Sequence, residues 1–363
     1  MAAVDGDILV IGAGLAGSLA ALALRQEGLA VTVVAPQQQA IASYASYGGV
    51  VGWPALPGPL GEAMLRAPEC WRALEQAHGP LGWQSCELSL HWQEAEAEAA
   101  LPLVEHLMSR VSEARPEPRR LILPFGRVDG EQLARALPQA LAHSGVRRLD
   151  AEVLSLAPLA PQGWRLQLAG GDHLEAPKVL LAAGPGCLGL WPPLAERQPP
   201  ALAMSWSGAL ALAAGAIGPE SLPAGAAEGI VIPLLGRRQA LEARCQSLQQ
   251  PAWIVDAGLA PRGQGWWLGQ ISVVAPGGAW QNVPDPAWME AELRQGLGAV
   301  WPELASLPGR LVQVPVAFPT AAGPLCGALA AAPGLWALAG FQAAFALLPV
   351  LVPDLASALA GTR

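Results

Sequence analysis

The sequence of 363 residues predicts a mixed α/β and antiparallel β fold, in which a doubly wound α/β domain is interrupted by a second, sheet-based domain. Three observations support this prediction. A strand, a glycine-rich turn and a helix open the chain between Asp7 and Leu24. Short β-like runs separated by glycine and proline turns fill 201–315. An α/β texture returns after 316, so both ends of the chain are expected to build one domain.

The length and composition set the class of protein. A chain of this length is longer than one core usually serves, so two domains are expected. Hydrophobic residues make up 52% of the chain and charged residues 14%, which is typical of a globular protein. The net charge is −8, and all but one of the 21 basic residues are arginines that do not cluster. We therefore expect no nucleic-acid partner.

The cysteines and the N-terminus bear on location. Five cysteines, an odd number, show no C-x-x-C spacing, which argues against a disulfide framework and a zinc ribbon. No metal site is predicted, and a reducing, cytoplasmic location is expected. Asp5 and Asp7 stand where an export signal would be basic, so no signal is predicted. Lys178, the only lysine, precedes an apolar strand and is interpreted as a strand-edge charge rather than a Schiff-base residue.

One stretch is apolar enough to raise the question of a membrane span. Residues Leu335 to Leu359 are almost uncharged and rich in alanine and leucine. Pro349, Pro353 and Asp354, together with the turn at Gly340, divide this stretch into a strand and a helix. We therefore predict a buried core segment and no membrane span.

The opening stretch is typical of nucleotide binding. Gly12, Gly14 and Gly17 form G-x-G-x-x-G between a strand and a helix beginning near Leu15, and a second strand follows at Val31 to Val34. In such a Rossmann-like βαβ unit the glycines permit a tight turn, a close approach to a pyrophosphate and helix-on-strand packing. The phosphates would bind at the helix N-terminus, where free N–H groups and the helix dipole favour anions.

The next part of the chain is predicted to be a loop followed by mostly helical segments. The loop from Ala40 to Pro59 contains both tyrosines, Tyr44 and Tyr47, and would cover a nucleotide or its prosthetic ring; alternatively, it is a solvent loop whose tyrosines pack against the protein. The pattern then predicts one or two helices over 60–78, a strand at 86–92, a helix at 94–113, a surface connection at 115–120 and a helix over 128–145 capped by Asp129.

The second half is predicted to be mainly β. Strands are expected at 149–156, 164–168, 174–183, 208–213, 229–234, 252–256, 265–274 and 335–339, with helices at 286–297 and from Ala343. The strand V-L-L-A-A-G-P-G, which ends at Gly186, has small residues because a backbone that crosses close to a nucleotide leaves no room for side chains. The tryptophans of the inserted part would form core, or would wall a flat ligand.

Four features in this order resemble the FAD-dependent oxidoreductases of the D-amino acid oxidase, glycine oxidase and sarcosine oxidase group. They are the opening glycine motif, the loop Ser43 to Gly49, the V-L-L-A-A-G-P-G strand and the ending G-P-L-C-G…G-L-W-A-L-A-G-F, which closes at Phe341. The resemblance implies a discontinuous Rossmann-like FAD domain of 1–56, 125–200 and 316–363. An inserted substrate or cap domain would comprise 57–124 and 201–315.

The resemblance also implies a site. Hydride would pass from the carbon beside an amine to the flavin, and oxygen or another acceptor would reoxidise it. No protein acid or base is assigned, so the catalytic candidates are the residues near the ring, Gly340, Phe341, Gln342 and Tyr47. The resemblance implies that FAD contacts the following residues: Gly12, Ala13, Gly14, Leu15, Ala16, Gly17, Ala35, Gln37, Ser43, Ser46, Gly48, Gly49, Val153, Ala183, Gly184, Gly323, Gly327, Gly340, Phe341 and Gln342.

The sequence departs from the family pattern in two places. Ala35 stands where an acid usually binds the adenosine ribose, so Gln37 or backbone would have to substitute. Ala317 and Ala322 stand near the places of the substrate-carboxylate arginine and of an aspartate. Four arginines of the inserted domain are candidate replacements, although each is expected at the surface: Arg237, Arg238, Arg244 and Arg262.

Two functional hypotheses follow. The first is an FAD-dependent oxidoreductase for a small-molecule amine or amino-acid-like substrate that is not gripped in the family's usual way. The alternative is a flavin-binding or flavin-lost member of the fold with a structural or regulatory role. An NAD(P) dehydrogenase is disfavoured because the A-A-G-P-G strand and the C-terminal glycine motif are flavoprotein features. The electron acceptor and the oligomeric state stay open.

Overall fold

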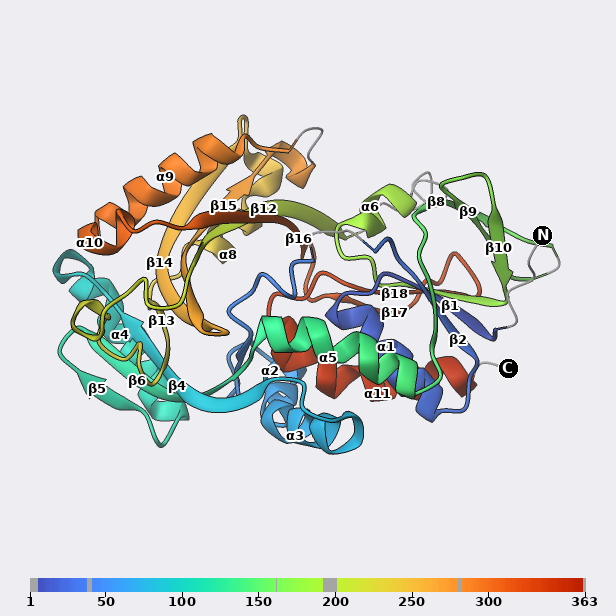
Figure 1. Ribbon diagram of the computed structural model, residues 1–363, viewed down its shortest axis with the longest axis horizontal. Helices are drawn as coiled ribbons and strands as arrows, with labels where there is room; N and C mark the ends of the chain where they lie inside the picture. Colours follow the sequence, from blue (N-terminus) through green and yellow to red (C-terminus); the bar gives the residue numbers. More distant parts are fainter. Residues whose placement is uncertain (1–5, 38–40, 161, 192–200, 280–282, 362–363) are drawn as a thin grey trace. The chain divides into compact units, whose positions relative to one another are not determined.

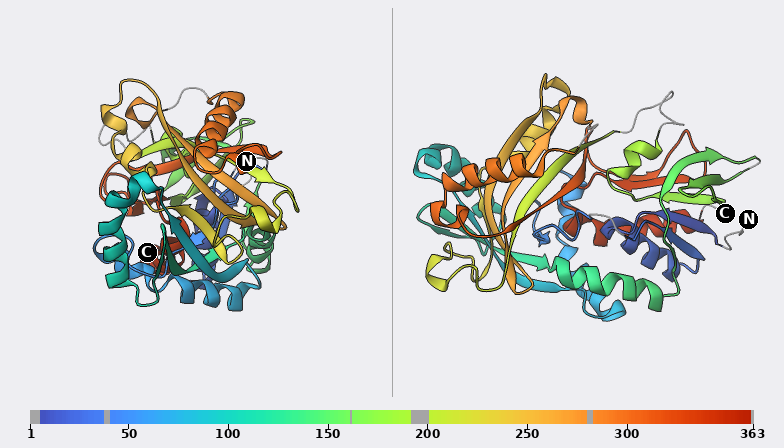
Figure 2. Two further views of the ribbon diagram at one scale, coloured as in Figure 1. Left: turned by 90° about the vertical axis from the view of Figure 1, so that its left-hand side faces the viewer. Right: turned by 45° about the horizontal axis from the view of Figure 1, so that its top comes forward.

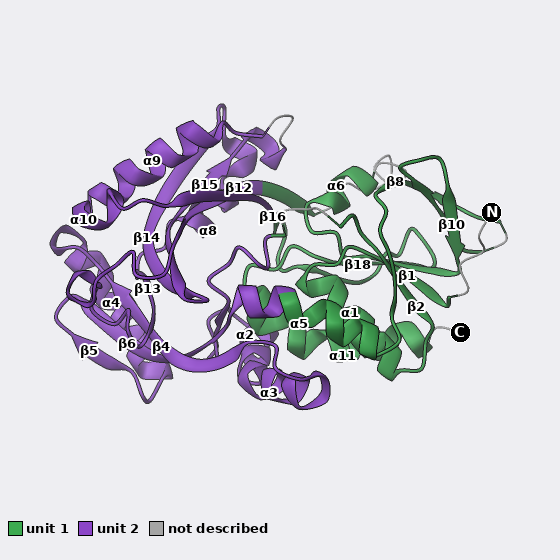
Figure 3. Cartoon of the chain, viewed as in Figure 1, with its two compact units in different colours: residues 1–41, 135–204, 316–363 green, residues 42–134, 205–315 purple. Residues whose placement is uncertain are grey.

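The computed structural model describes residues 6–37, 41–160, 162–191, 201–279 and 283–361. The chain divides into two compact units, each built from separate segments (Figure 3). Unit 1 comprises 1–41, 135–204 and 316–363, and unit 2 comprises 42–134 and 205–315. Each unit therefore has its own core, and the chain crosses from one unit to the other four times.

Unit 1 is built on a six-stranded sheet. In spatial order its strands are β17 (Leu325–Ala328), β18 (Leu335–Ala339), β11 (Lys178–Leu181), β1 (Ile8–Ile11), β2 (Val31–Val34) and β7 (Arg147–Leu149). The pairs from β18 to β7 are parallel, and only β17 runs antiparallel to its neighbour. The sheet is thus the predicted α/β domain, assembled from three separate parts of the chain.

Helices cover this sheet. Helix α1 (Leu15–Gln26) follows β1, and α11 (Ala344–Gly361) packs against α1 although it comes from the other end of the chain (Figure 1). Strand β1 is fully buried, as expected for a central parallel strand covered on both faces. The amine of Lys178 donates a hydrogen bond of 2.6 Å to the Leu359 carbonyl at the end of α11, where the helix dipole favours a cation.

Within the described residues, α11 is the one helix long and apolar enough to cross a membrane, judged by length and composition alone. In the structure 56% of its residues are buried. The predicted division of this stretch into a strand and a helix is confirmed, with Gly340 between β18 and α11 at φ 79°.

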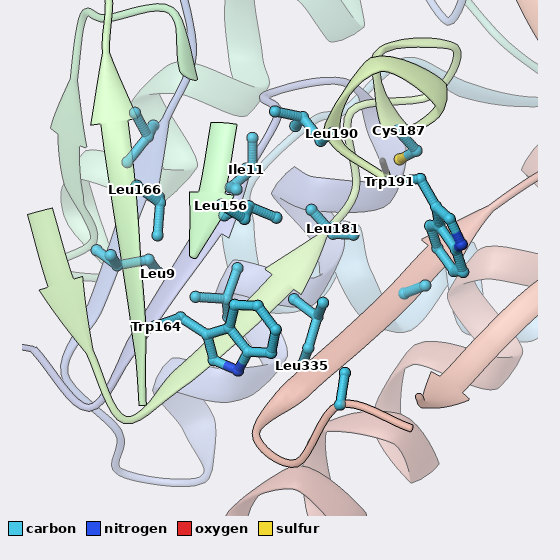
Figure 4. Packing of buried hydrophobic residues seen from close by; sticks show 14 of the residues in the cluster. Leu9, Ile11, Leu156, Trp164, Leu166, Leu181, Cys187, Leu190, Trp191 and Leu335 are labelled. Atoms are coloured by element: carbon cyan, nitrogen blue, oxygen red, sulfur yellow. The ribbon is translucent and has the colours of Figure 1, made fainter. Parts of the chain in front are cut away.

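A small antiparallel sheet completes unit 1. Its strands are β8 (Val153–Pro158), β9 (Trp164–Leu168) and β10 (His173–Ala176). Figure 4 shows how its side chains pack on the parallel sheet, with Leu166 beside Leu9 and Trp164 beside Leu335. The short helix α6 (Gly186–Leu190) adds Cys187 to this cluster.

Two predicted strands of this region are each two strands. The strand predicted at 149–156 is β7 and β8, and the strand predicted at 174–183 is β10 and β11. Each pair lies in two different sheets, so the chain must leave one sheet before it enters the next. At the second break stands Pro177, which has no N–H to give to a ladder.

Unit 2 is built on a long, curved sheet, and the further views show how strongly its strands bend (Figure 2). Along the sheet the strands are β16 (Arg310–Pro319), β12 (Leu202–Leu212), β15 (Gly265–Val274), β14 (Ala252–Arg262), β13 (Gly229–Pro233), β4 (Trp83–His91), β6 (Arg120–Val128) and β3 (Gly49–Val50), and β5 (Arg115–Glu117) pairs with β6. The sheet is mostly antiparallel as predicted, but β13 and β4 pair in parallel.

The helices of unit 2 agree broadly with the prediction. They are α2 (Pro59–Met64), α3 (Ala67–His78), the 3-10 turn η1 (Glu94–Glu96) leading into α4 (Ala97–Arg110), α8 (Arg238–Ala243), α9 (Pro286–Gly298) and α10 (Pro302–Ala305). Helix α5 (Gly130–His143) begins in unit 2 and ends in unit 1. Asp129 caps it as predicted, accepting the N–H groups of Glu131 and Gln132 at 3.0 Å.

The predicted surface connection at 115–120 is wrong. It is a β-hairpin in which β5 turns into β6, with Arg119 at φ 56° in the turn. Strand β6 itself escaped prediction because Pro124 and Gly126 interrupt its apolar run. Gly126 is needed there, since a Cβ would lie 2.1 Å from the Trp83 ring.

The predicted domain boundaries concern where FAD binds, and they stay a prediction. The compact units place 42–56 and 125–134 in unit 2, because β3 and β6 pair in its sheet. The other boundaries of the units lie within a few residues of the predicted ones.

Candidate functional site

The glycine motif forms a tight turn between β1 and α1. Gly12 has φ 109°, and a Cβ there would lie 2.5 Å from the Ala182 carbonyl oxygen and 2.8 Å from Ala183 Cα. A Cβ on Gly17 would lie 2.0 Å from the Gly12 oxygen and 3.4 Å from the Ala182 side chain. Gly12, Gly17 and Ala182 are therefore small because the protein's own backbone fills the space. We call these residues, with Gly14, the glycine cradle.

The N-terminus of α1 suits an anion. Gly14 is the N-cap residue, no side chain caps the helix, and its first turn carries no acidic residue. The buried Ser18 hydroxyl donates a hydrogen bond of 3.2 Å to the Ala13 carbonyl and so ties the turn to the first part of the helix. The helix dipole and its terminal N–H groups can therefore act on a phosphate without a competing carboxylate.

An acid that the sequence analysis missed lies beside the end of β2. Ala35 is 4% exposed, and its N–H donates to the Leu149 carbonyl at 3.1 Å. Two residues further on, the Gln37 N–H donates to Asp150 Oδ1 at 2.7 Å. Asp150 is exposed and follows β7, the sheet neighbour of β2. Asp150 could have been predicted only from the pairing of β7 with β2, and the sequence does not reveal this pairing.

Other predicted residues of unit 1 lie just after strands β11 and β18 of the parallel sheet or in the small antiparallel sheet. Gly184 has φ 56°, and a Cβ there would meet no atom within 4 Å. Val153 is half-buried in β8, opposite Leu168. A Cβ on Gly340 would lie 2.5 Å from Leu202 Cδ2. At both glycines the positive φ favours glycine, and at Gly340 a Cβ would in addition press on the Leu202 side chain.

The C-terminal part of the motif is more open. Gly323 and Gly327 have φ 91° and 146°, Phe341 is half-buried and Gln342 is exposed. Ala317, which stands near the place of the family's carboxylate-binding arginine, is 8% exposed in the core of unit 1.

The predicted flavin-covering loop belongs to unit 2 from Ala42 onward, and its first residue, Ala40, lies outside the described residues. Ser46 Oγ accepts the Gly48 N–H at 3.1 Å, and a Cβ on Gly48 would lie 2.0 Å from the Val128 oxygen. Ser43 is half-buried, and Gly49 opens β3. Gly48 and Gly49 thus lie against β6 within unit 2.

The arginines proposed as replacements are engaged elsewhere or exposed. Arg237 pairs with Glu96 at 2.9 Å, Arg238 with Glu242 at 2.7 Å and Arg262 with Glu131 at 2.8 Å. Arg244 is exposed. None of these four arginines therefore offers an unpaired, buried guanidinium to a carboxylate.

A buried arginine that the sequence analysis did not single out has a structural role. Arg127 is 6% exposed and donates to the Pro261 carbonyl and to Gln84 Oε1, both at 3.1 Å. It also lies 3.5 Å from Asp129. Burial alone would raise the pKa of Asp129, but N–H groups of Gln132, Gly263 and Glu131 and the Arg127 charge outweigh it and lower that pKa.

Metal and disulfide chemistry find no support in the described part of the chain. No group of three or more potential metal ligands occurs among the described residues. All five cysteines, which are described, are free thiols.

The parallel sheet and the glycine cradle define a dinucleotide-binding α/β protein with an added sheet domain. The family model of the FAD dependent oxidoreductases, DAO, matches residues 7–351. The chain belongs to this family, and it is therefore an FAD-dependent oxidoreductase. No curated protein sequence matches it.

Solved structures share the fold over nearly the whole chain. A glycine oxidase from Geobacillus kaustophilus is 16% identical, with a TM-score of 0.73 over 97% of this chain and 95% of that one. An L-amino acid deaminase from Proteus vulgaris is 14% identical, with a TM-score of 0.70 over 100% and 96%. An iminodiacetate oxidase from Chelativorans sp. BNC1 is 18% identical, with a TM-score of 0.67 over 98% and 94%. At such identities the likeness is one of fold.

Proposed function

We propose that this FAD-dependent oxidoreductase oxidises a small-molecule amine by hydride transfer to the flavin. The observation that carries the proposal is the glycine cradle at the N-terminus of α1, in a chain whose family is FAD-dependent. The amine is supported by the names of similar structures, which include a glycine oxidase, an amino acid deaminase and an iminodiacetate oxidase.

The residues of unit 1 fit FAD. The pyrophosphate would bind at Gly12 to Gly17, where the helix end is uncapped by side chains and free of acids in its first turn. Asp150 would accept the adenosine ribose hydroxyls, because its exposed carboxylate lies at the end of β7 and is held beside the end of β2 by Gln37. In this way the residue that follows the neighbouring strand β7 would supply the acid that is missing at Ala35.

Bound FAD would accept the hydride from the carbon beside the amine and would be reduced. The substrate would be left as an imine once the amine has also lost a proton. The chain's own part is to bind and orient. The cradle would hold the phosphates through backbone N–H groups, and the small Ala182 and Ala183 let β11 end close to the turn. Gly340 bends the chain between β18 and α11 and so sets the course of Phe341 and Gln342.

The test is an anaerobic titration. The purified chain is loaded with FAD, freed of excess, and titrated with glycine, sarcosine, D- and L-amino acids and carboxylate-free amines while the flavin absorbance is followed. We expect at least one amine to bleach the flavin. A chain that holds FAD and is bleached by dithionite, yet by none of the amines, would contradict the proposal. In that case the structural or regulatory alternative would gain support.

A further inference from the structure

Unit 2 carries a row of polar side chains on one face of its sheet. Strands β12, β15 and β14 are neighbours, with Ser207 opposite Ser272 and Gln270 opposite Asp256. Side chains alternate between the faces of a strand, so Ser205 shares the face of Ser207. We call Ser205, Ser207, Ser272, Gln270 and Asp256 the polar stripe.

The polar stripe lies on the face of the sheet that α9 does not cover. Met289, Leu293 and Leu297 of α9 pack with Ile271 and Val273, which alternate with the stripe residues along β15. The α9 face is therefore an apolar core. The packing of α9 therefore does not explain the polar side chains on the opposite face.

Two hydroxyls of the polar stripe are buried without a partner. Ser205 is 0% exposed and Ser207 is 8% exposed, and among the described residues neither Oγ has a hydrogen-bond partner. Ser272 is also 0% exposed, but its Oγ accepts a bond of 3.2 Å from Gln270 Nε2. Because a buried hydroxyl without a partner costs free energy, two such groups side by side indicate that something polar binds there.

A third unpartnered hydroxyl stands at the end of the polar stripe. Tyr47 Oη is buried without a partner among the described residues and lies 2.8 Å from where a Cβ of Gly258 would be. The pairing register shifts after Asp256, but Val255 and Ala257 both pack in the α9 core, so Asp256 and Gly258, which alternate with them, face away from α9. Burial and the nearby Asp256 raise the pKa of Tyr47, which keeps the phenol neutral and able to donate.

Asp256 gives the polar stripe an acceptor. Its Oδ1 accepts the Arg237 N–H at a long 3.4 Å, and both nearby guanidinium groups, of Arg237 and Arg238, are paired with glutamates. Burial raises the pKa of Asp256 more than these neighbours lower it. Asp256 and Gln270 are only half-buried, so a ligand can approach the stripe from their side.

We propose that the polar stripe, with Tyr47, binds the substrate, and that this substrate is a hydroxylated amine without a carboxylate. The inference rests on the proposed amine oxidation. Serine and tyrosine hydroxyls pair with a substrate hydroxyl, and the Asp256 carboxylate accepts from an ammonium group. A carboxylate would instead meet the Asp256 charge, and no residue of the stripe is basic.

The experiment compares substrates that differ only at the carboxylate. FAD-loaded protein is titrated anaerobically with sarcosine and with N-methylethanolamine, and with glycine and ethanolamine. Dissociation constants are measured by calorimetry, and flavin bleaching is followed in parallel. We expect each amino alcohol to bind at least about tenfold more tightly than its amino acid, because the amino alcohol adds a hydrogen bond and avoids a like charge.

Two serine variants and a matched control locate the effect. Ser205→Ala and Ser207→Ala should each raise the dissociation constant of N-methylethanolamine about three- to tenfold. Neither should destabilise the ligand-free protein, because the hydroxyl removed has no partner there. Ser89→Ala is the control: Ser89 is 0% exposed with an unpartnered Oγ, but it lies on β4, outside the stripe. It should leave the dissociation constant unchanged.

The outcomes separate the two proposals. Tighter binding of sarcosine than of N-methylethanolamine, or equal dissociation constants of N-methylethanolamine for Ser207→Ala and Ser89→Ala, would overturn the inference. Flavin bleaching by sarcosine would in that case still support the proposed amine oxidation. No bleaching by any amine, in protein that dithionite bleaches, would overturn the proposed function itself. Bleaching by the amino alcohols with the serine effects would support both.

Discussion

The glycine cradle can be tested at Gly17, where the structure gives a direct magnitude. An alanine methyl there would lie 2.0 Å from the Gly12 oxygen and 3.0 Å from its carbonyl carbon. Both are backbone atoms of the turn, so the turn itself must move. Overpacking costs about 1–3 kcal/mol, and the better helix propensity of alanine returns about 1 kcal/mol. Because the clash is with backbone, the cost lies at the upper end of this range, and we expect a net loss of about 2 kcal/mol in the free energy of unfolding.

The assay combines urea unfolding with FAD binding. Since the moved turn also displaces the N–H groups that we propose to bind the phosphates, Gly17→Ala should raise the dissociation constant of FAD at least about tenfold. Gly189→Ala is a matched control, because Gly189 also lies in a helix of unit 1 and a Cβ there meets no atom within 4 Å. Gly189→Ala should lower neither the free energy of unfolding nor the affinity for FAD. Equal stability and equal FAD affinity of the two variants would refute the reasoning.

Three further predictions concern single residues. Asp150→Asn should weaken FAD binding several-fold without changing the affinity for FMN, which lacks the adenosine; equal losses for both flavins in fluorescence titrations would count against a ribose contact. Asp129→Ala should lower the free energy of unfolding at neutral pH. Because the folded-state pKa of Asp129 is lowered, its contribution is complete above the ordinary carboxyl pKa of about 3.9 and is lost as the pH falls through the lowered value. A difference in the free energy of unfolding between wild type and variant that does not narrow in acid would speak against this prediction. Gly14→Val should abolish flavin retention while the chain stays folded by circular dichroism, and a yellow, FAD-loaded variant would remove Gly14 from the site.

The sequence predicted the elements that a strong local signal specifies. The strands flanking the glycine motif and the helix that begins at Leu15 follow from the motif's spacing, and Asp129 caps its helix as a local N-cap should. The return of the chain to the first domain after 316 was also correct, because β18 completes the parallel sheet beside β11.

What the sequence could not predict depends on sheet neighbours. Strand β6 carries Pro124 and Gly126, so its pattern is broken although β4 pairs with it along its whole length. Asp150 matters only because β7 lies beside β2, and Ser207 and Ser272 are separated by more than sixty residues of chain before the sheet brings them together. Such contacts come from strand order, which a single sequence leaves open.

The glycines show a third kind of difference. From the sequence, the small residues Ala182 to Gly184 were attributed to a bound nucleotide. In the structure, the Ala182 carbonyl group already excludes a side chain at Gly12. Part of the motif is therefore required by the fold itself, and the variants above separate that requirement from the binding of FAD.

The central claim is that the chain oxidises an amine with FAD, and anaerobic reduction of the bound flavin tests it most directly. We predict that N-methylethanolamine bleaches the flavin absorbance of the FAD-loaded protein and that the colour returns when an electron acceptor is admitted. An unchanged spectrum with N-methylethanolamine and every other amine of the panel, in a sample that dithionite bleaches fully, would contradict the claim.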